Sequence, residues 1–410
     1  MTNKNYIFCL LTSTVEENKI FDIYDNYISE IIKKYGKFTI INFCRYEHKK
    51  KKRNNSKIFK DAFSNKVDFF YPKNKSEFLN YIKNKKVLAI DSLGKTFKEF
   101  GIRYLIKRQN IFLILITNIG YLSNEEKTFT NTSKKNKNFL FIKFLNKFIY
   151  RLFILLNLFP KTYLYFESRK KIFENFQNGK IRKITKKFPI FDFLLNFINV
   201  YKINSTAYDN YINYQKENRN KKGNIVFIDG NYKHQDIAQR ENIDLNNLKN
   251  KYFKLLKIQF NYLEKIFKKK VEICLHPSSD KNAYKKYFKN FIIYKGKTKE
   301  KVLESYMVVF HESSSVMDAI ISKKKILIFE TDLFGKYFSK RINLYKEILK
   351  LPSINIENST NLTRSKILKK FKSTSKYRNF YVKNNLNSDG SELATKKFIR
   401  IIEKLIKNEK

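Results

Sequence analysis

Short apolar runs alternate with longer stretches in which apolar residues recur every three or four positions along the first third of the chain. The apolar runs are Tyr6–Thr12, Phe38–Cys44, Val67–Tyr71, Val87–Asp91 and Ile111–Thr117. Stretches with helical spacing, such as Phe21–Tyr35 and Ser76–Lys85, separate these runs. Strands separated by helices predict βαβ units and therefore a parallel sheet. Gly120 and the polar stretch 123–138 are expected to close this half.

The same alternation returns after Gly223 and predicts a second α/β domain. Its apolar runs are Ile225–Asp229, Val271–Leu275, Phe291–Tyr294, Met307–Phe310 and Ile326–Thr331. Its helical stretches are Leu248–Lys268, Lys281–Phe288, Lys299–Ser305 and Val316–Ser322. The polar run Gln215–Gly223 has the composition of a linker, and 410 residues are too many for one ordinary core. We therefore expect an N-terminal domain at 1–214 and a C-terminal domain at 223–410, and we allow the last helix, near Glu392–Asn408, to cross back.

The segment Phe139–Phe159 departs from this alternation because it is apolar throughout except for regularly spaced cations. Lys143, Lys147 and Arg151 recur every four residues, so a helix would carry them on one face. The length approaches that of a membrane span, but three internal cations argue against one. An amphipathic helix lying on acidic lipid headgroups fits the pattern, and a buried helix between the domains fits it equally. The basic and aromatic stretch Lys161–Lys187 could extend the same surface.

The chain has 85 Lys and Arg against 37 Asp and Glu, a formal net charge of +48. Such a charge favours an anionic partner, either nucleic acid, a membrane surface or an acidic substrate. Lys, Asn, Ile, Phe and Tyr are abundant together and Trp is absent, which indicates that compositional bias explains most of the charge. The lysines are scattered through every segment and form no single stripe, so no nucleic-acid partner is expected.

Cys9, Cys44 and Cys274 all lie in apolar runs, and their number is odd. This pattern predicts reduced, buried thiols in a cytosolic protein rather than a disulfide framework. The absence of C-x-x-C argues against a structural zinc site. The N-terminal apolar run is too short for a signal peptide and soon reaches Glu16 and Glu17, so it predicts a first strand.

Three of the four histidines follow apolar runs in the second half: His234, His276 and His311. The loops at the carboxyl ends of parallel strands form the ligand crevice of open α/β sheets. In His276-Pro277-Ser278-Ser279, Pro277 ends the strand, and Ser278 or Ser279 could cap the next helix. A histidine at this edge can donate to a phosphate oxygen or protonate a leaving group, or it can simply bond a loop carbonyl.

The series His311-Glu312-Ser313-Ser314-Ser315 runs from a strand through a Ser-rich turn into a helix. This order brings hydroxyls and free backbone N–H groups to a helix N-terminus, where the dipole favours an anion. An ordinary serine cap would explain one serine but not three in a row. We therefore expect His311, Glu312 and the three serines to bind phosphate.

Two further junctions carry candidate residues. Asp229 and Gly230 end the first strand of the second half, with Asp236 in the following loop; Asp229 is a possible general base or only a turn cap. Lys297 is a candidate phosphate partner and Thr298 a candidate helix cap, although this order is not a Walker motif. Neither a carboxylate-rich cluster nor a D-x-D triplet accompanies the histidines, so we expect no metal and no other cofactor.

Several of these segments, taken in order, resemble those of a known group of proteins. They are FIDGNYKHQD, KYFKLLKIQFNYLEKIF, VEICLHPSS, YKGKTKEKVLES and VVFHESSSVMDAIISKKKILIFET, with INSTAYDNYI upstream. The series is similar to bacterial surface-carbohydrate biosynthesis proteins related to the sialyltransferase-like glycosyltransferases of the GT-B fold. The resemblance covers about Asn204 to Asp332, the middle third of the chain.

The resemblance implies an α/β, GT-B-like fold in which two Rossmann-like domains with parallel sheets face a central cleft. It implies a metal-independent enzyme that moves a sugar from a nucleotide-activated donor, such as a CMP-linked one, onto a capsule or lipopolysaccharide glycan or a lipid-linked acceptor. In such enzymes the His-Pro and Ser-Ser motifs engage the nucleotide phosphate. Their acidic base comes from a carboxylate-Gly motif of the first domain, whereas Ile228-Asp229-Gly230 lies in the second, so Asp91 competes for that role.

Other functions stay open on the sequence alone. The chain can be a catalytically silent protein of the same fold that binds nucleotide or carbohydrate, since no base is assigned. A basic nucleic-acid-binding protein is favoured only by the net charge. For the enzyme, we expect a cytoplasmic protein held peripherally on the inner face of the bacterial inner membrane, where a soluble donor and a lipid-linked acceptor meet.

Overall fold

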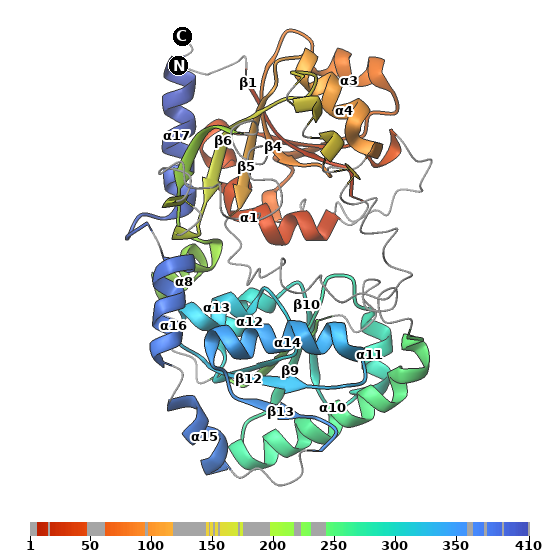
Figure 1. Cartoon of the computed structure of the whole chain (residues 1–410), viewed down its shortest axis with the longest axis vertical. Coiled ribbons are helices and arrows are strands. Elements are labelled where there is room, and N and C mark those ends of the chain that lie inside the picture. The colour runs from red at the N-terminus through yellow and green to blue at the C-terminus, as the bar shows by residue number, and fades with distance from the viewer. Residues whose placement is uncertain are drawn as a thin grey trace. The chain divides into compact units, whose positions relative to one another are not determined.

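The computed structural model in Figure 1 contains two compact α/β units. The first unit comprises Met1–Asn118, Lys137–Asn204 and Ser388–Lys410, and the second comprises Ile119–Asn136 and Ser205–Asn387. The structure describes residues 6–14, 17–46, 62–94, 97–117, 145–146, 148–150, 152–154, 156–170, 173–174, 197–216, 223–230, 243–358, 364–372, 375–387 and 389–408.

The first unit is built on a seven-stranded parallel sheet with the order β3-β2-β1-β4-β5-β6-β7. Its strands are β1 (Tyr6–Thr12), β2 (Phe38–Asn42), β3 (Val67–Phe70), β4 (Lys86–Ser92), β5 (Phe112–Thr117), β6 (Thr162–Glu167) and β7 (Phe197–Lys202). Its helices are α1 (Glu17–Tyr35), α3 (Lys75–Ile82), α4 (Phe97–Arg108) and α17 (Ala394–Asn408), with a short 3-10 turn η1 (Phe43–Arg45).

Alternation along β1 explains why helices cover both faces of this sheet. Phe8 and Leu10 belong to a core cluster shared with α1 and α17, whereas Cys9 and Leu11 belong to a second cluster shared with α3 and α4. Successive side chains of a strand point to opposite faces, so the two clusters lie on opposite sides of the sheet. The first unit is therefore a three-layer α/β/α sandwich.

Two strands of this sheet, β6 and β7, were not predicted from the sequence. The sequence interpretation closed the first half at 123–138 and allowed Lys161–Lys187 to extend a basic surface, whereas Thr162–Glu167 forms β6. The run Thr162–Glu167, TYLYFE, contains three aromatic residues and a threonine, residue types that are enriched in strands. The lysines around this six-residue run obscured it.

The second unit is built on a six-stranded parallel sheet with the order β10-β9-β8-β11-β12-β13. Its strands are β8 (Ile225–Ile228), β9 (Val271–Leu275), β10 (Ile292–Lys295), β11 (Met307–Phe310), β12 (Lys325–Glu330) and β13 (Ser353–Asn355). Its helices are α8 (Thr206–Lys216), α10 (Leu245–Phe267), α11 (Lys281–Tyr287), α12 (Thr298–Glu304), α13 (Val316–Ile321), α14 (Gly335–Leu349), α15 (Arg364–Lys372), α16 (Ser375–Tyr381) and η4 (Val382–Leu386). The five strands predicted for this half are all present.

Helix α10 shows how local sequence sets the length of an element. Its N-cap is Asp244, whose carboxylate accepts a hydrogen bond from the backbone N–H of Asn246, and it ends at Lys268 in the left-handed conformation with φ 54°. Between these ends, a stripe of buried residues at helical spacing faces the sheet. The ring of Phe260 in this stripe lies 5.0 Å from that of Phe227 in β8.

The chain leaves the first unit at Asn204 and returns to it at Ser388. The Asn204 side-chain amide donates to the carbonyl oxygens of Gly390 at 3.0 Å and Glu392 at 2.8 Å, and its oxygen accepts the Asp389 N–H at 2.9 Å. These three hydrogen bonds fix the start of the last segment. The helix that follows, α17, packs on α1 and so belongs to the first unit.

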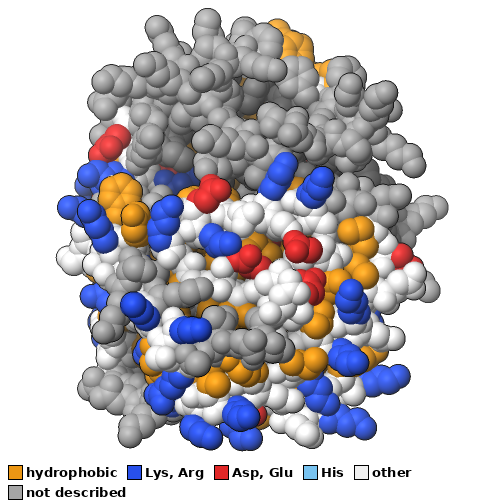
Figure 2. Space-filling model, turned by 60° about the horizontal axis from the view of Figure 1, so that its bottom comes forward, with side chains coloured by type: hydrophobic (Ala, Val, Ile, Leu, Met, Phe, Trp, Pro, Cys, Tyr) orange, Lys and Arg blue, Asp and Glu red, His pale blue; other side chains and the backbone are white. Residues whose placement is uncertain are grey.

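Lysine and arginine side chains are dispersed over the surface rather than gathered in one stripe, as Figure 2 shows for the face that it presents. Some Asp and Glu side chains lie between them on the same face. This distribution agrees with a bias of composition as the source of most of the charge. Within the described residues, no helix has both the length and the hydropathy needed to cross a membrane.

We expect Phe398→Ala to destabilise the first unit selectively, because its fully buried ring packs 5.0 Å from that of Tyr27 and 5.1 Å from that of Phe166. Loss of a buried phenyl ring costs about 3–5 kcal/mol. Hydrogen exchange should report faster opening in β1, β6 and α1 and unchanged protection in β8–β12. Phe380→Ala, at a side chain with 71% exposure on α16, is the matched control. Equal loss of protection in both units would contradict this assignment of α17.

Candidate functional site

The sequence-predicted site residues lie at one edge of the second sheet. The strands β10, β9, β8 and β11 are neighbours, and their last residues are in register: Lys295 with Leu275, Cys274 with Ile228, and Ile228 with Phe310. The loops that follow these strands contain Lys297 and Thr298, His276–Ser279, Asp229–Gly230 and His311–Ser315. In an open parallel sheet, this carboxyl edge is where ligands bind.

Asp229, at the end of β8, connects the central strand to the loop that contains His276. Its carboxylate accepts hydrogen bonds from Ser279 Oγ at 2.5 Å, Tyr284 Oη at 2.7 Å and the His276 backbone N–H at 3.3 Å. The side chain is buried, with 1% exposure, and so are Ser279 and Tyr284. The carboxylate oxygens are thus already occupied by three donors, so this geometry favours a positioning role over that of a general base.

The ring of His276 is oriented by the residue two positions further along the chain. Its Nδ1 accepts the Ser278 backbone N–H at 3.2 Å and lies 2.7 Å from Ser278 Oγ. Because a backbone N–H can only donate, Nδ1 must carry the lone pair, and the proton of the neutral ring is on Nε2. His276 is partly exposed, so Nε2–H can serve as a hydrogen-bond donor at the carboxyl edge.

The helix after this loop is not capped by serine. Asp280 is the N-cap of α11, and its carboxylate accepts the backbone N–H of Asn282 at 2.9 Å. The expectation that Ser278 or Ser279 would cap this helix was wrong, because Ser279 donates to Asp229 and Ser278 contacts the His276 ring. Lys295 Nζ donates to the Ser279 carbonyl at 2.9 Å and brings a positive charge to the same loop.

The loops after β8 and β11 contact each other through their backbones. A Cβ atom at Gly230 would lie 2.7 Å from the Glu312 carbonyl oxygen, so only glycine fits this approach. The Glu312 carboxylate forms an ion pair with Arg341 of α14, and the nearby carboxylate raises the pKa of Arg341. This pairing favours an anchoring role for Glu312 over direct contact with phosphate.

The three serines after β11 are partly exposed at the start of α13. Ser313 Oγ accepts the Ser315 backbone N–H at 3.3 Å, whereas the N-cap Ser315 makes no side-chain capping bond. The hydroxyls are therefore not consumed by capping, which leaves the predicted phosphate contact chemically feasible. Helix α13 has only six residues, fewer than two turns, so its dipole contributes less than the sequence interpretation assumed.

His311 lies in the aromatic core rather than at the surface. Its exposure is 1%, and its Nδ1 lies 2.6 Å from the Phe329 carbonyl oxygen, to which it donates. Aromatic rings surround it at centroid distances of 5.7–6.1 Å, namely Phe227, Tyr252, Phe329 and Phe338. Burial lowers the pKa of His311 to about 4, so the ring is neutral at physiological pH. This environment favours a structural role over the predicted phosphate contact.

Two other predicted residues, Lys297 and Thr298, lie at the start of α12. Lys297, which is exposed, is the N-cap of α12 and makes no side-chain capping bond. Thr298 is the first helical residue, so the expectation that it caps this helix was wrong. His234 and Asp236 lie outside the described residues.

Asp91, the competing candidate for the base, forms a buried ion pair at the carboxyl end of β4. Arg103 Nη1 and Nη2 donate to its two carboxylate oxygens at 3.1 Å and 3.3 Å, and the Leu93 N–H donates at 3.0 Å. Arg103 is fully buried and also donates to the Gly94 carbonyl at 3.0 Å. The Asp91 carboxylate therefore orders its own loop, which favours a structural role.

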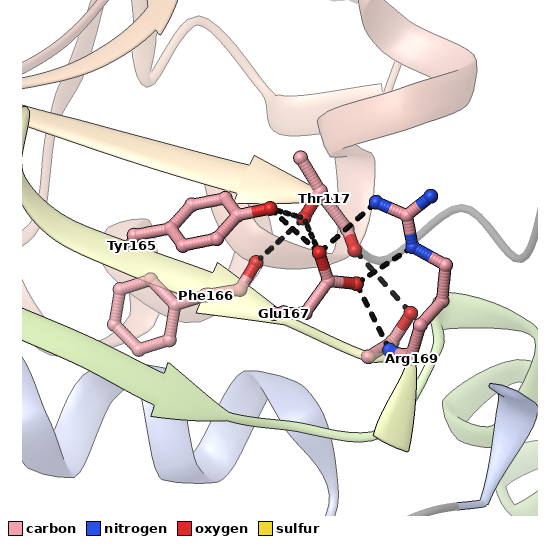
Figure 3. A network of polar contacts seen from close by, with 6 residues as sticks. Thr117, Tyr165, Phe166, Glu167 and Arg169 are labelled. Atoms are coloured by element: carbon pink, nitrogen blue, oxygen red, sulfur yellow. Dashed lines mark hydrogen bonds and ion pairs between the residues drawn. The ribbon is translucent and has the colours of Figure 1, made fainter. Parts of the chain in front are cut away.

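One group of polar residues in the first unit was missed at the level of sequence. Glu167 and Arg169, at the carboxyl end of β6, form a hydrogen-bonded network with Thr117 and Tyr165 (Figure 3). A charged residue at the end of an aromatic strand was the available signal, and the unrecognised β6 concealed it. In the second unit, Tyr284 was missed because only the tertiary fold brings it to Asp229.

One depression of the described surface lies away from both carboxyl edges. It has a volume of about 640 Å³ and is lined by residues that include Leu79, Lys83, Lys86 and Gln109. Lys86 is the first residue of β4, so the depression lies at the amino edge of the first sheet. Ligand binding at parallel sheets occurs at the other edge, so we do not assign the site to this depression.

The structure confirms that the three cysteines are buried and form no disulfide among the described residues. Cys9, Cys44 and Cys274 are free thiols with buried side chains. Burial raises the pKa of Cys9 and raises that of Cys274 to about 12. Both thiols are therefore protonated and unreactive at neutral pH.

Comparison with known proteins gives matches among solved structures. No protein family matches the sequence. No curated protein matches it as a sequence relative. Two structures of the wall teichoic acid polymerase TagF align with TM-scores of 0.53 and 0.50 and identities of 14% and 13%, over 98% of this chain and 89% and 90% of those chains. A UDP-N-acetylglucosamine 2-epimerase from Neisseria meningitidis aligns with a TM-score of 0.48 and 12% identity, over 97% of this chain and 100% of that chain.

At these identities, the similarity describes the fold and not the reaction. The two teichoic acid polymerase structures match over nearly the full length of this chain, and both of its sheets are parallel and covered by helices. The chain therefore has the predicted GT-B-like fold of two Rossmann-like domains. The sialyltransferase-like part of the expectation stays a prediction.

The buried histidine generates a test of stability against pH. Because the pKa of His311 is about 4 in the folded protein against 6.5 in a free chain, the unfolded state binds a proton below about pH 6.5 that the folded state binds only below about pH 4. Above about pH 6.5 this histidine does not affect the free energy of unfolding. Below it, the free energy of unfolding decreases as the pH falls toward about 4. By about pH 4.5, the wild-type protein should lose about 2–3 kcal/mol of unfolding free energy that His311→Phe does not lose. Urea unfolding at both ends of the window measures the difference.

Phe338→Leu is the control, because it weakens the same aromatic cluster but keeps the histidine. It should lower the unfolding free energy at both pH values and retain the acid-dependent loss. Identical pH dependence in wild type and His311→Phe would show that this ring is not held neutral by burial.

Proposed function

We propose that this protein is a glycosyltransferase that moves a sugar from a nucleotide-activated donor onto a bacterial surface glycan or a lipid-linked acceptor. The observation that carries the proposal is the hydrogen bonding of Asp229, which holds the His276 loop at the carboxyl edge of the second sheet. The Ser313–Ser315 loop, also at this edge, offers hydroxyl and backbone N–H groups. This combination suits a phosphate group that leaves with negative charge.

The reaction breaks the bond between the anomeric carbon and the phosphate oxygen of the donor. A hydroxyl of the acceptor attacks that carbon, and the bonding electrons leave with the nucleotide phosphate. His276, through the proton on Nε2, donates a hydrogen bond or the proton itself to the departing oxygen. The acceptor hydroxyl gives up one proton, so the overall products are the glycoside, the nucleotide and a proton.

The local positive charge suits a mechanism without metal, as we propose here. Lys295, the last residue of β10, is held against the Ser279 carbonyl, and Lys297 lies two residues beyond it. Together with His276, these side chains can offset the charge of the departing phosphate. In this proposal Asp229 is a positioning residue, which replaces its expected role as a base, and Pro277 directs the chain out of β9 toward Ser278.

A cytidine nucleotide is the donor that we propose. The His-Pro and Ser-Ser segments resemble those of sialyltransferase-like enzymes, which implies a CMP-linked sugar. One of the teichoic acid polymerase structures was obtained after soaking with CDPG, which supports the choice of a cytidine nucleotide in this proposal. The acceptor class, a capsule, lipopolysaccharide or lipid-linked glycan, follows from the same resemblance.

We also propose that the protein works at the inner face of the bacterial membrane. Helical turns at 145–146, 148–150 and 152–154 pack against α4 through Tyr150, which lies 6.3 Å from the Phe100 ring, and through Ile154. Phe148, Leu152 and Leu156 are nevertheless 53%, 41% and 59% exposed and recur every four residues. Such a stripe suits insertion into the headgroup boundary.

The cations predicted for this surface, Lys143, Lys147 and Arg151, lie outside the described residues, as do Lys171 and Lys180–Lys187. Arg169, which the sequence interpretation added to the surface, is instead paired with Glu167. In sequence, Lys147 and Arg151 directly precede Phe148 and Leu152. Near an anionic leaflet each cation contributes about 1 kcal/mol, so apolar contact and a few charges suffice for reversible attachment.

We expect CMP or CDP to bind the wild-type protein, as measured by calorimetric titration, and UDP to bind more weakly. His276→Ala should weaken binding at least about tenfold, because a charge-assisted hydrogen bond to phosphate contributes about 1.5–3 kcal/mol. Asp229→Asn should weaken it comparably by releasing the loop. Asp244→Asn, the same substitution at the exposed cap of α10, is the control.

Unchanged CMP affinity in both His276→Ala and Asp229→Asn would contradict the proposed site. Binding without turnover across a panel of activated sugars would favour a catalytically silent relative. Salt-sensitive binding of a short DNA duplex, with no nucleotide binding, would instead favour the nucleic-acid alternative.

We expect the protein to float with phosphatidylglycerol vesicles and to bind them less well at high salt, because the attraction between charges is screened. Replacing both Phe148 and Leu152 by Ser should reduce the bound fraction severalfold by removing apolar contact. Ile258→Ser, at an apolar side chain with 46% exposure on α10, is the matched control. If the double variant floats as well as the wild type, Phe148 and Leu152 do not attach the protein to the membrane.

A further inference from the structure

The strand order of the second sheet places a topological switch point between β8 and β11. From β8 the chain runs outward through β9 to β10, and it then crosses to the other side of β8 and continues through β11, β12 and β13. Because crossovers between parallel strands are right-handed, the connections that lead to β9 and β12 cover opposite faces of the sheet. The loops after β8 and β11 therefore diverge, and ligands of open parallel sheets bind at such a point.

The two diverging loops contact each other at Gly230. A Cβ atom at this position would lie 2.7 Å from the Glu312 carbonyl oxygen and 3.8 Å from its carbonyl carbon. Both are backbone atoms, so any larger residue would force one loop to shift. The preceding residue, Asp229, accepts hydrogen bonds from the Ser279 hydroxyl and the His276 backbone N–H. The dipeptide after β8 thus contacts both loops that the proposed function assigns to the phosphate.

Helix α14 holds the loop after β11 from another side. The Glu312 carboxylate forms an ion pair with the Arg341 guanidinium, and the two side chains are 15% and 33% exposed. The guanidinium carbon lies 5.6 Å from the centre of the Tyr337 ring, and Nη1 is 3.5 Å from the Tyr337 hydroxyl. Opposite charges attract more strongly in such a partly buried place than in open solvent. The ion pair therefore limits where the Glu312 side chain can lie.

The rest of this loop is short and is closed by its own hydrogen bonds. The Ser313 carbonyl accepts the Val316 N–H at 3.3 Å, and the Ser314 carbonyl accepts the Met317 N–H at 3.1 Å. All six residues of α13 are buried, so this helix cannot follow a shift of the loop. A displacement of Glu312 therefore has to be absorbed by the serines that follow it.

We propose that Gly230, Glu312 and Arg341 are positioning residues of the phosphate site, and that Gly230 links the serine loop to the His276 loop so that both are set as one unit. The phosphate site itself rests on the proposed function. Arg341 acts through Glu312 rather than by touching the phosphate. A phosphate that enters the site meets the hydroxyls and backbone N–H groups of one loop and the His276 ring of the other, with neither loop left to be ordered.

Calorimetric titration with CMP tests the ion pair. Glu312→Gln and Arg341→Gln should each weaken CMP binding about tenfold, and the double variant should bind no more weakly than either, because both substitutions remove the same contact. Cytidine, which lacks the phosphate, should bind the wild type and the variants equally. Lys346→Gln is the matched control, because it removes the ion pair of 2.5 Å that α14 forms with Glu330 and should leave CMP affinity unchanged.

Hydrogen exchange measures the order of the loop without nucleotide. In Glu312→Gln the amides of Val316 and Met317 should exchange about tenfold faster, whereas the amides of β9 keep their protection. In Gly230→Ala the Ser279 amide, which donates to the His276 carbonyl at 2.9 Å, should exchange faster as well. Faster exchange in only one of the two loops of Gly230→Ala would show that they are not set as one unit.

Unchanged exchange or unchanged CMP affinity in Glu312→Gln would overturn the proposal, and so would an equal loss of CMP and cytidine binding. Glu312→Gln decides the matter if Gly230→Ala fails to fold. A wild type that binds no CMP, with exchange that changes in Glu312→Gln as expected, would contradict the proposed function but keep the role of these residues in ordering the loop.

Discussion

The parallel pairing of every strand is the constraint on which the rest of this structure depends. A parallel strand must be reached by a crossover, so each strand of a sheet starts at one edge and ends at the other. In the second sheet, this requirement collects four loops, after β10, β9, β8 and β11, at one edge although their residues span Asp229 to Ser315. The crossover helices bury both faces of the strands. The buried carboxylates of Asp91, Glu167 and Asp229 lie at strand ends.

Three buried carboxylates at these ends order the loops that follow them. Asp91 pairs with Arg103 after β4, Glu167 pairs with Arg169 after β6, and Asp229 accepts from Ser279 and Tyr284 after β8. A buried charge is stable only when donors surround it, so each carboxylate fixes several groups at once. None of the three therefore has the environment of a general base. Their shared effect is to pre-orient neighbouring side chains, which is the property that a binding site requires.

The basic residues contribute to anion binding in different ways in different parts of the chain. On the face shown in Figure 2, lysines and arginines are dispersed, and dispersed charges contribute a long-range attraction but no geometry. At the strand ends, single cations are placed by the fold: Lys295 against the Ser279 carbonyl and Arg169 against Glu167. Placement rather than number makes these cations candidates for binding anions. The proposed donor site follows from this distinction.

Local patterns in the sequence were enough to establish the alternation of strands and helices, and with it the parallel sheets and the position of His276 at a strand end. These features are local, because the period and length of apolar runs depend only on neighbouring residues. Strand β6 escaped prediction because six residues among lysines carry a weak signal, and α17 was placed by packing of Phe398 on Tyr27, far away in sequence.

Three properties of the candidate sites became visible only in the folded chain. His311 is buried, Asp229 accepts from three donors, and Arg169 is held against Glu167. Burial and hydrogen bonding depend on which segments meet in space, and no local pattern contains that information.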